Sequence, residues 1–156
     1  MSLEVFISYS ALADQIIALR LQTWAALYGL RAFVPPASTR RNGRALLSRE
    51  VEQRIGESDV VLAVVTRAPS PASIAEIEYA RGRNKLILPI VGPGVDRQFL
   101  AEFPQAFFLD PQNPSQVEAQ IVEFLKQRQT EEGNRNLLIA LSALAVALLL
   151  FPAESG

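Results

Sequence analysis

Apolar residues in the first 130 positions of this 156-residue chain gather in short clusters of two kinds. Some are continuous runs rich in β-branched side chains, which predict strands buried on both faces, as in a parallel sheet. These buried strands are Asp59–Val65 and Leu86–Val91, and the short segments Glu4–Ser8, Arg31–Val34 and Ala106–Leu109 predict three further strands. In the segments between them, apolar residues recur every three or four positions, which is typical of amphipathic helices.

The predicted helices alternate with the strands along the chain. They are Ala11–Tyr28, marked by Leu12, Ile16, Leu19 and Leu27 and ended by Gly29; a helix marked by Leu47, Val51 and Ile55; Ser70–Arg83; and Ser115–Gln129. This alternation predicts an α/β fold, with a parallel sheet of about five strands and helices on both faces. Such sheets bind ligands beyond the carboxyl ends of their strands, so the loops that follow the strands are the candidate site.

In two of the predicted helices, a serine followed by a glutamate can mark the first turn. Ser115 is followed three residues later by Glu118, which predicts a capping box. Ser73 and Glu76 fit the same pattern, although Ser70 followed by Pro71 offers a competing start with proline at the first helical position. Glu76 is therefore either part of a cap or available for chemistry.

The last predicted element differs from all the others. Leu137–Phe151 contains no charged residue, and Ser142 is its only polar side chain. Fifteen residues of helix span about 23 Å, against a hydrocarbon core of roughly 30 Å, and flanking residues could lengthen the segment a little. We expect a transmembrane helix over 137–153; a buried or oligomer-forming helix is the alternative.

The charge distribution predicts how such a tail would be oriented. Lys126, Arg128 and Arg135 precede the apolar segment, and no Lys or Arg follows it. The positive-inside rule then places the main domain in the cytoplasm, so we expect a membrane protein with a single-pass C-terminal anchor. The predicted organisation is a main domain over residues 1–130, a polar linker over 131–136 and the tail.

The composition excludes several kinds of chemistry. The chain has neither Cys nor His, which excludes disulfides, thiolate nucleophiles, Ser-His-Asp triads and most transition-metal sites, and we expect no metal. Its net charge of −1 gives no indication of nucleic-acid binding. Any catalysis must therefore depend on carboxylates, hydroxyls, Arg, Lys or backbone groups.

An ordered series of short motifs extends through residues 3–130. It consists of Phe6–Ser10 (FISYS), Gly29–Val34, Gly43, Ile55–Leu62, Ser70–Ala80 and Leu86–Val91. In content and order the series resembles the boxes of TIR (Toll/interleukin-1 receptor) domains. The resemblance implies a flavodoxin-like fold, and contacts with other TIR domains through homo-oligomers.

Many TIR domains cleave NAD⁺ at the bond between nicotinamide and ribose, with an essential Glu in the third helix. The resemblance places that catalytic residue at Glu76, with NAD⁺ as substrate and no bound cofactor. Loss of nicotinamide leaves a positively charged, oxocarbenium-like ribose that a carboxylate can stabilise. Nicotinamide leaves as a neutral group, so the reaction needs no His.

Other residues of the motifs are candidates for the same site. We expect Phe6, Ser8, Tyr9, Ser10, Gly43 and Arg44 to contact substrate, and Arg40 and Arg41 to belong to an assembly loop. Arginines in this loop suit either nucleotide phosphates or an acidic face of a neighbouring copy. A solvated loop is the alternative explanation for their charge.

Two positions depart from the family pattern. Ala72 stands where TIR domains often have Trp, and Pro35 stands where an acidic residue often follows the second strand. One hypothesis is therefore an NAD⁺ glycohydrolase or cyclase that acts in defence or signalling when assembled at a membrane. A non-catalytic TIR adaptor is the second, and an enzyme similar to nucleoside deoxyribosyltransferases is a third.

Overall fold

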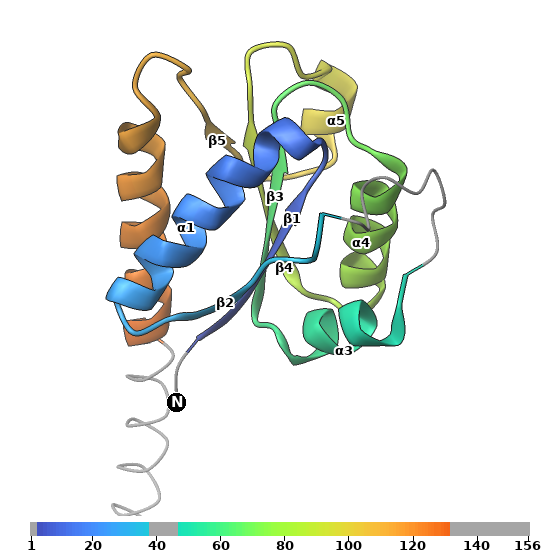
Figure 1. Cartoon of the computed structure of the whole chain (residues 1–156), viewed down its shortest axis with the longest axis vertical. Helices are drawn as coiled ribbons and strands as arrows, with labels where there is room; N and C mark the ends of the chain where they lie inside the picture. The colour runs from blue at the N-terminus through green and yellow to red at the C-terminus, as the bar shows by residue number, and fades with distance from the viewer. Residues whose placement is uncertain (1–2, 38–46, 132–156) are drawn as a thin grey trace, which may run out of the picture.

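Five parallel strands form the centre of the molecule (Figure 1). The computed structural model describes residues 3–37 and 47–131. The strands are β1 (Glu4–Tyr9), β2 (Arg31–Phe33), β3 (Val60–Val65), β4 (Leu86–Val91) and β5 (Phe107–Phe108). Their order in the sheet is β2-β1-β3-β4-β5, so the predicted flavodoxin-like arrangement of about five parallel strands is confirmed.

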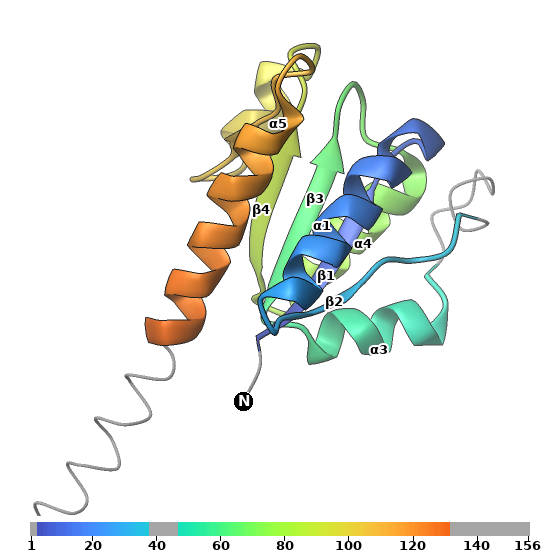
Figure 2. The same cartoon turned by 60° about the vertical axis from the view of Figure 1, so that its left-hand side comes forward.

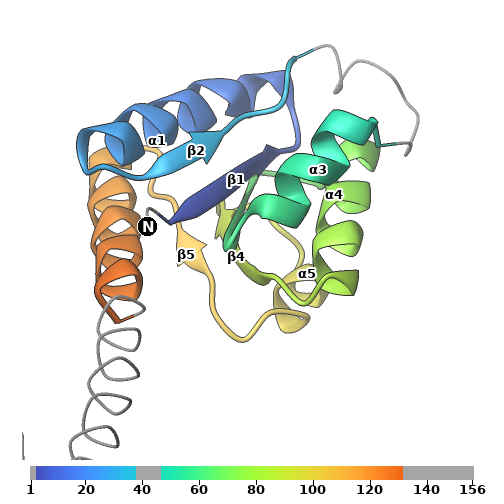
Figure 3. The ribbon, with the colours of Figure 1, turned by 90° about the horizontal axis from the view of Figure 1, so that it is seen from below.

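Helices cover both faces of this sheet, as predicted. They are the 3₁₀ helix η1 (Leu12–Asp14), α1 (Gln15–Leu27), α3 (Arg49–Glu57), α4 (Pro71–Gly82), α5 (Arg97–Ala101) and a last helix over residues 114–131. Helix α1 and the last helix lie on one face, while α3 and α4 lie on the other (Figures 2 and 3). The short α5, which lies between β4 and β5, was not predicted.

The two sides of β1 face two separate apolar cores. Val5, Ile7 and Tyr9 belong to the core that includes residues of α1 and of the last helix. Phe6 belongs to the core beneath α3 and α4, where its ring stacks on Phe33 with centroids 5.7 Å apart. This division follows from the alternation of side chains along a strand, and it also determines which side chains can meet at the end of β1.

The apolar pattern that predicts the first helix does not mark its buried face. The buried residues of α1 are Ala18, Leu21 and Ala25. Leu12, Ile16, Leu19 and Leu27, which we call the α1 stripe, are 43%, 68%, 44% and 72% exposed. At about 100° per residue, the α1 stripe lies opposite the buried face. The face that packs on the sheet carries Ala18, Leu21 and Ala25, with Ile17 partly buried against the same core.

The predicted end of this helix is confirmed. Gly29 has a φ of +75°, and its N–H donates to the carbonyl of Ala26 over 3.1 Å. The N–H of Leu30 donates to the carbonyl of Ala25 over 2.9 Å. These two bonds form a Schellman motif, in which glycine adopts the left-handed backbone at low cost.

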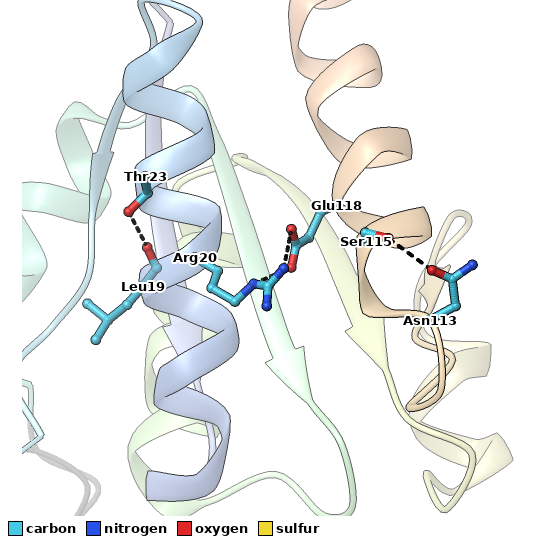
Figure 4. A network of polar contacts seen from close by, with 6 residues as sticks. All are labelled: Leu19, Arg20, Thr23, Asn113, Ser115 and Glu118. Atoms are coloured by element: carbon cyan, nitrogen blue, oxygen red, sulfur yellow. Dashed lines mark hydrogen bonds and ion pairs between the residues drawn. The ribbon is translucent and has the colours of Figure 1, made fainter.

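The capping box predicted at Ser115 is wrong. The last helix already begins at residue 114, and the Ser115 hydroxyl donates to Oδ1 of Asn113 over 2.9 Å. Glu118, whose side chain is 3% exposed, instead pairs with Arg20, with 2.7 Å between Nε and Oε1 (Figure 4). The guanidinium of Arg20 compensates the buried carboxylate and connects α1 to the last helix.

Some predicted features lie outside the described residues. They are the loop that carries Arg40, Arg41, Gly43 and Arg44, the end of the predicted linker, and the apolar tail over 137–153. Within residues 3–37 and 47–131, no helix has the length and apolar character needed to cross a membrane.

Candidate functional site

Glu76 lies in the second turn of α4 and takes no part in starting that helix. Ser70 is the N-cap, and its hydroxyl oxygen accepts from the backbone N–H of Ser73 over 3.2 Å. Pro71 follows at the first helical position, where its missing N–H has no cost. The alternative in which Ser73 and Glu76 form the capping box is therefore wrong.

The carboxylate of Glu76 meets two serine hydroxyls between α4 and β1. Ser8 Oγ donates to Glu76 Oε1 over 2.7 Å, and it lies 3.3 Å from Ser73 Oγ. Glu76 is 1% exposed, and both serines are fully buried. A carboxylate withdrawn from water in this way needs hydrogen-bond donors, and Ser8 supplies one of them.

This Ser8–Ser73–Glu76 cluster joins two motifs that are 68 residues apart in the chain. Sequence patterns identified Ser8 and Glu76 as site residues but missed Ser73. The spacing in the sequence could have identified Ser73 as a neighbour of Glu76. Ser73 precedes Glu76 by three residues, which places both on one face of the helix. The cluster lies near the carboxyl end of β1, at the sheet edge where ligands are expected.

Two other predicted substrate residues are core residues in this structure. Phe6 is fully buried beneath α3 and α4. Tyr9 is fully buried on the opposite side of β1, where its hydroxyl donates to the carbonyl of Pro35 over 2.9 Å. This bond ties the end of β1 to the segment after β2.

Ser10 lies just past β1, two positions after Ser8. Its backbone N–H donates to the carbonyl of Val64 over 3.1 Å, which keeps this residue beside β3. Its side chain is buried, and among the described residues its Oγ has no hydrogen-bond partner. A buried hydroxyl without a partner is unusual in a native structure, so Ser10 has hydrogen-bonding capacity left for a ligand.

The two departures from the TIR pattern both lie in packed surroundings. Ala72, four residues before Glu76 in α4, is 6% exposed. Pro35 is buried, and its carbonyl holds the Tyr9 hydroxyl. Neither residue offers an aromatic ring or a carboxylate to a substrate. The other predicted contacts, Gly43 and Arg44, lie outside the described residues.

A cavity among the described residues is separate from this cluster. It has a volume of about 660 Å³ and is lined by residues such as Asp14, Thr66, Arg67 and Gly92, but not by Ser8, Ser73 or Glu76. In the described part of the chain, no group of three carboxylates could hold a metal ion. Two serine hydroxyls, those of Ser8 and Ser73, are among the groups that lie close to Glu76.

Comparison with known proteins gives a likeness of fold. No protein-family model and no curated protein matches the sequence. The structure is similar to the Vibrio vulnificus NanR protein complexed with ManNAc-6P, with a TM-score of 0.54 and 13% sequence identity. This match covers 99% of the chain but 58% of the NanR chain, so the chain spans little more than half of that protein. At this identity the likeness shows a shared fold and nothing about ligands.

A second match is to the TIR domains of the activated Roq1 resistosome, which directly recognises the pathogen effector XopQ. The TM-score is 0.47 at 17% identity, and the match covers 89% of this chain and 78% of that one. With a TM-score below 0.5, this likeness supports no conclusion about the chain. The resemblance to TIR domains therefore depends on the sequence motifs.

Replacing Ser8 by Ala tests whether the hydroxyl stabilises the buried carboxylate. We expect Ser8→Ala to lower the free energy of unfolding by about 1.5–3 kcal/mol, because a bond to a charged group is lost. Ser58→Ala is the matched control, since its buried hydroxyl donates to the backbone carbonyl of Ile55 over 2.7 Å and its loss should cost about 1 kcal/mol. Equal losses in chemical denaturation would contradict a special role for the bond to Glu76.

Proposed function

We propose that this chain is a TIR-type signalling domain that cleaves NAD⁺ at the nicotinamide–ribose bond, with Glu76 as the catalytic carboxylate. The observation that carries the proposal is the 2.7 Å contact between Ser8 and Glu76. It joins the first TIR-like motif to the motif that holds the family's essential Glu, and it does so near the carboxyl end of β1. The unpartnered Ser10 hydroxyl adds a further polar group beside that strand end.

The chemistry follows from the groups that the site holds. The bond between ribose C1′ and the nicotinamide nitrogen breaks, and its electron pair leaves with neutral nicotinamide. Positive charge develops on the ribose ring, where the Glu76 carboxylate stabilises it; a water oxygen, or a hydroxyl in a cyclase, then bonds to C1′ and loses its proton. Ser8 holds the carboxylate in place, so that it need not reorganise during the reaction.

Replacing Glu76 by Gln tests the catalytic role directly. The amide oxygen of Gln can still accept the Ser8 hydrogen bond, so the melting temperature should change little. Nicotinamide release from NAD⁺ by protein clustered on vesicles should fall at least about 100-fold, because the negative charge is lost. The control is Glu78→Gln, which removes a charge from the exposed face of the same helix and should leave the rate unchanged.

Two outcomes would contradict this proposal. The first is the absence of nicotinamide release from clustered wild-type protein. The second is a Glu76→Gln variant that melts several degrees lower while the folded fraction keeps its activity, since Glu76 would then stabilise the fold alone.

The alternative function is that of a non-catalytic TIR adaptor, which acts through contacts between TIR domains. Three observations favour it: Glu76 is 1% exposed, Ala72 offers no aromatic ring, and Pro35 uses its carbonyl to hold Tyr9. The nicotinamide assay on clustered wild-type protein separates the two functions, because an adaptor binds its partners and leaves NAD⁺ intact.

Self-assembly is common to both functions, and the α1 stripe supports it. Its four apolar residues run for roughly 22 Å from Leu12 in η1 along the side of α1 that faces away from the sheet. The same stripe on a second copy would cover it in a two-fold, self-complementary contact, which is how most homodimers form. We propose that a second copy of this chain covers the α1 stripe.

An acidic residue in the middle of the stripe should prevent this contact. We expect Ile16→Glu to shift the domain toward monomer in light scattering at increasing concentration, because the dimer would bury an unpaired charge. The control is Ile74→Glu, at an isoleucine on α4 that is 41% exposed. Equal effects of the two variants, or a monomeric wild-type protein, would exclude the stripe as the contact.

The apolar segment 137–153 supports membrane attachment, with the TIR-type domain on the cytoplasmic side. Removal of all residues after Asn134 takes away the whole segment. We expect the shortened protein to move from the membrane to the soluble fraction, because about 15 apolar residues are lost. A truncated protein that stays with membranes would disprove this attachment, and a full-length protein that is already soluble would favour a buried or oligomer-forming helix.

A further inference from the structure

The cavity of about 660 Å³ lies at the carboxyl edge of the sheet, on the side covered by α1. Loops that follow four strands, β1, β3, β4 and β5, supply its walls. The chain passes from β1 outward to β2 and from β3 outward to β4, so β1 and β3 flank the topological switch point of this sheet. Open α/β sheets bind ligands in the crevice at such a point.

Small and rigid residues keep this cavity open. Ala11, Ala13, Ala68 and Gly94 line it, and their small size leaves the space unfilled. Gly92 also lines it and packs directly on the end of β3, since a Cβ added there would lie 2.4 Å from the carbonyl oxygen of Thr66. Prolines at 93, 111 and 114 restrict the backbone of the remaining walls.

A hydrogen-bonded carboxylate fixes the part of the wall that joins β1 to β3. Asp14 is 2% exposed; Thr66 Oγ1 donates to its Oδ1, and the N–H of Ala11 donates to its Oδ2 over 3.3 Å. Because both oxygens already accept from the protein, the site does not require a cation. The same carboxylate would repel an anion placed deep in the cavity.

Arg67 gives the cavity a positive charge on its exposed side. It lines the cavity, its side chain is exposed, and it forms no ion pair with any residue that the structure describes. Most of the remaining wall is hydrocarbon from Ala, Pro, Ile and Leu side chains. A guanidinium at the mouth of an apolar cavity suits a carboxylate or phosphate attached to an apolar body.

We infer that this cavity is a second small-molecule site, which binds an organic anion with a flat apolar body of about mononucleotide size. The ring system lies against the Ala and Pro wall, and the anionic group lies outward at Arg67, away from Asp14. The volume falls within the range of about 300–1,000 Å³ that is usual for such sites. The site is separate from Glu76, which lies on the other side of the sheet.

The test is calorimetric titration of the full-length chain in mild detergent with three phosphates: flavin mononucleotide, adenosine monophosphate and nicotinamide mononucleotide. Each is paired with its unphosphorylated nucleoside or riboflavin. We expect at least one phosphate to bind with sub-millimolar affinity and its uncharged parent to bind about tenfold more weakly. Arg67→Gln should remove that tenfold difference, whereas Arg97→Gln, at an exposed arginine on α5 outside the cavity, should preserve it.

Filling the cavity provides an independent check. Ala13→Trp and Ala68→Trp place a large ring at exposed positions on two different walls, so the fold should persist while binding falls at least tenfold. Glu76→Gln should bind the phosphate as the wild type does, which separates this site from the proposed catalytic one. The inference is overturned if none of the three phosphates binds, or if binding survives Arg67→Gln and both filling variants.

Discussion

The parallel pairing of β1 with β3 is the constraint on which the rest of this structure depends. Its register runs from Val5 opposite Val60 to Tyr9 opposite Val64, so the two buried strands end together. Because the chain moves outward from this pair in both directions, the loops after β1 and β3 must diverge at the carboxyl edge. The polar cluster around Glu76 and the cavity beside Asp14 both lie close to this pair.

Because side chains alternate along β1, the polar cluster around Glu76 and the cavity beside Asp14 lie on opposite sides of this strand. Ser8 points toward α4 and reaches Glu76, whereas Tyr9 belongs to the core beneath α1. A shift of one residue in the register would exchange the two sets of side chains, so the β1–β3 pairing determines the chemistry as well as the fold. The two candidate sites can therefore bind different molecules, since β1, which is buried from Val5 to Tyr9, separates them.

Sequence patterns predicted where the helices and strands lie in the chain better than they predicted which side chains would meet. Strand β4 has the predicted bounds and β3 differs by one residue, because continuous β-branched runs are hard to place anywhere but in a buried sheet. Periodicity also predicted the first helix, but it could not show which side packs on the sheet, and the large residues of the α1 stripe lie outside. The error at Glu118 has a similar cause, since its partner Arg20 is 98 residues away in the chain.

At the candidate site, too, sequence patterns identified residues but did not predict their tertiary contacts. Resemblance to a family identified Glu76 and Ser8, but only tertiary structure shows that Ser73 joins them and that the carboxylate is 1% exposed. Under the proposed function, this burial has two opposing effects. A carboxylate withdrawn from water stabilises a developing positive charge more strongly, because little solvent screens it. The same burial requires the covering residues to move before a ribose can approach the carboxylate, so the reaction needs both the charge of Glu76 and an opening of the structure around it.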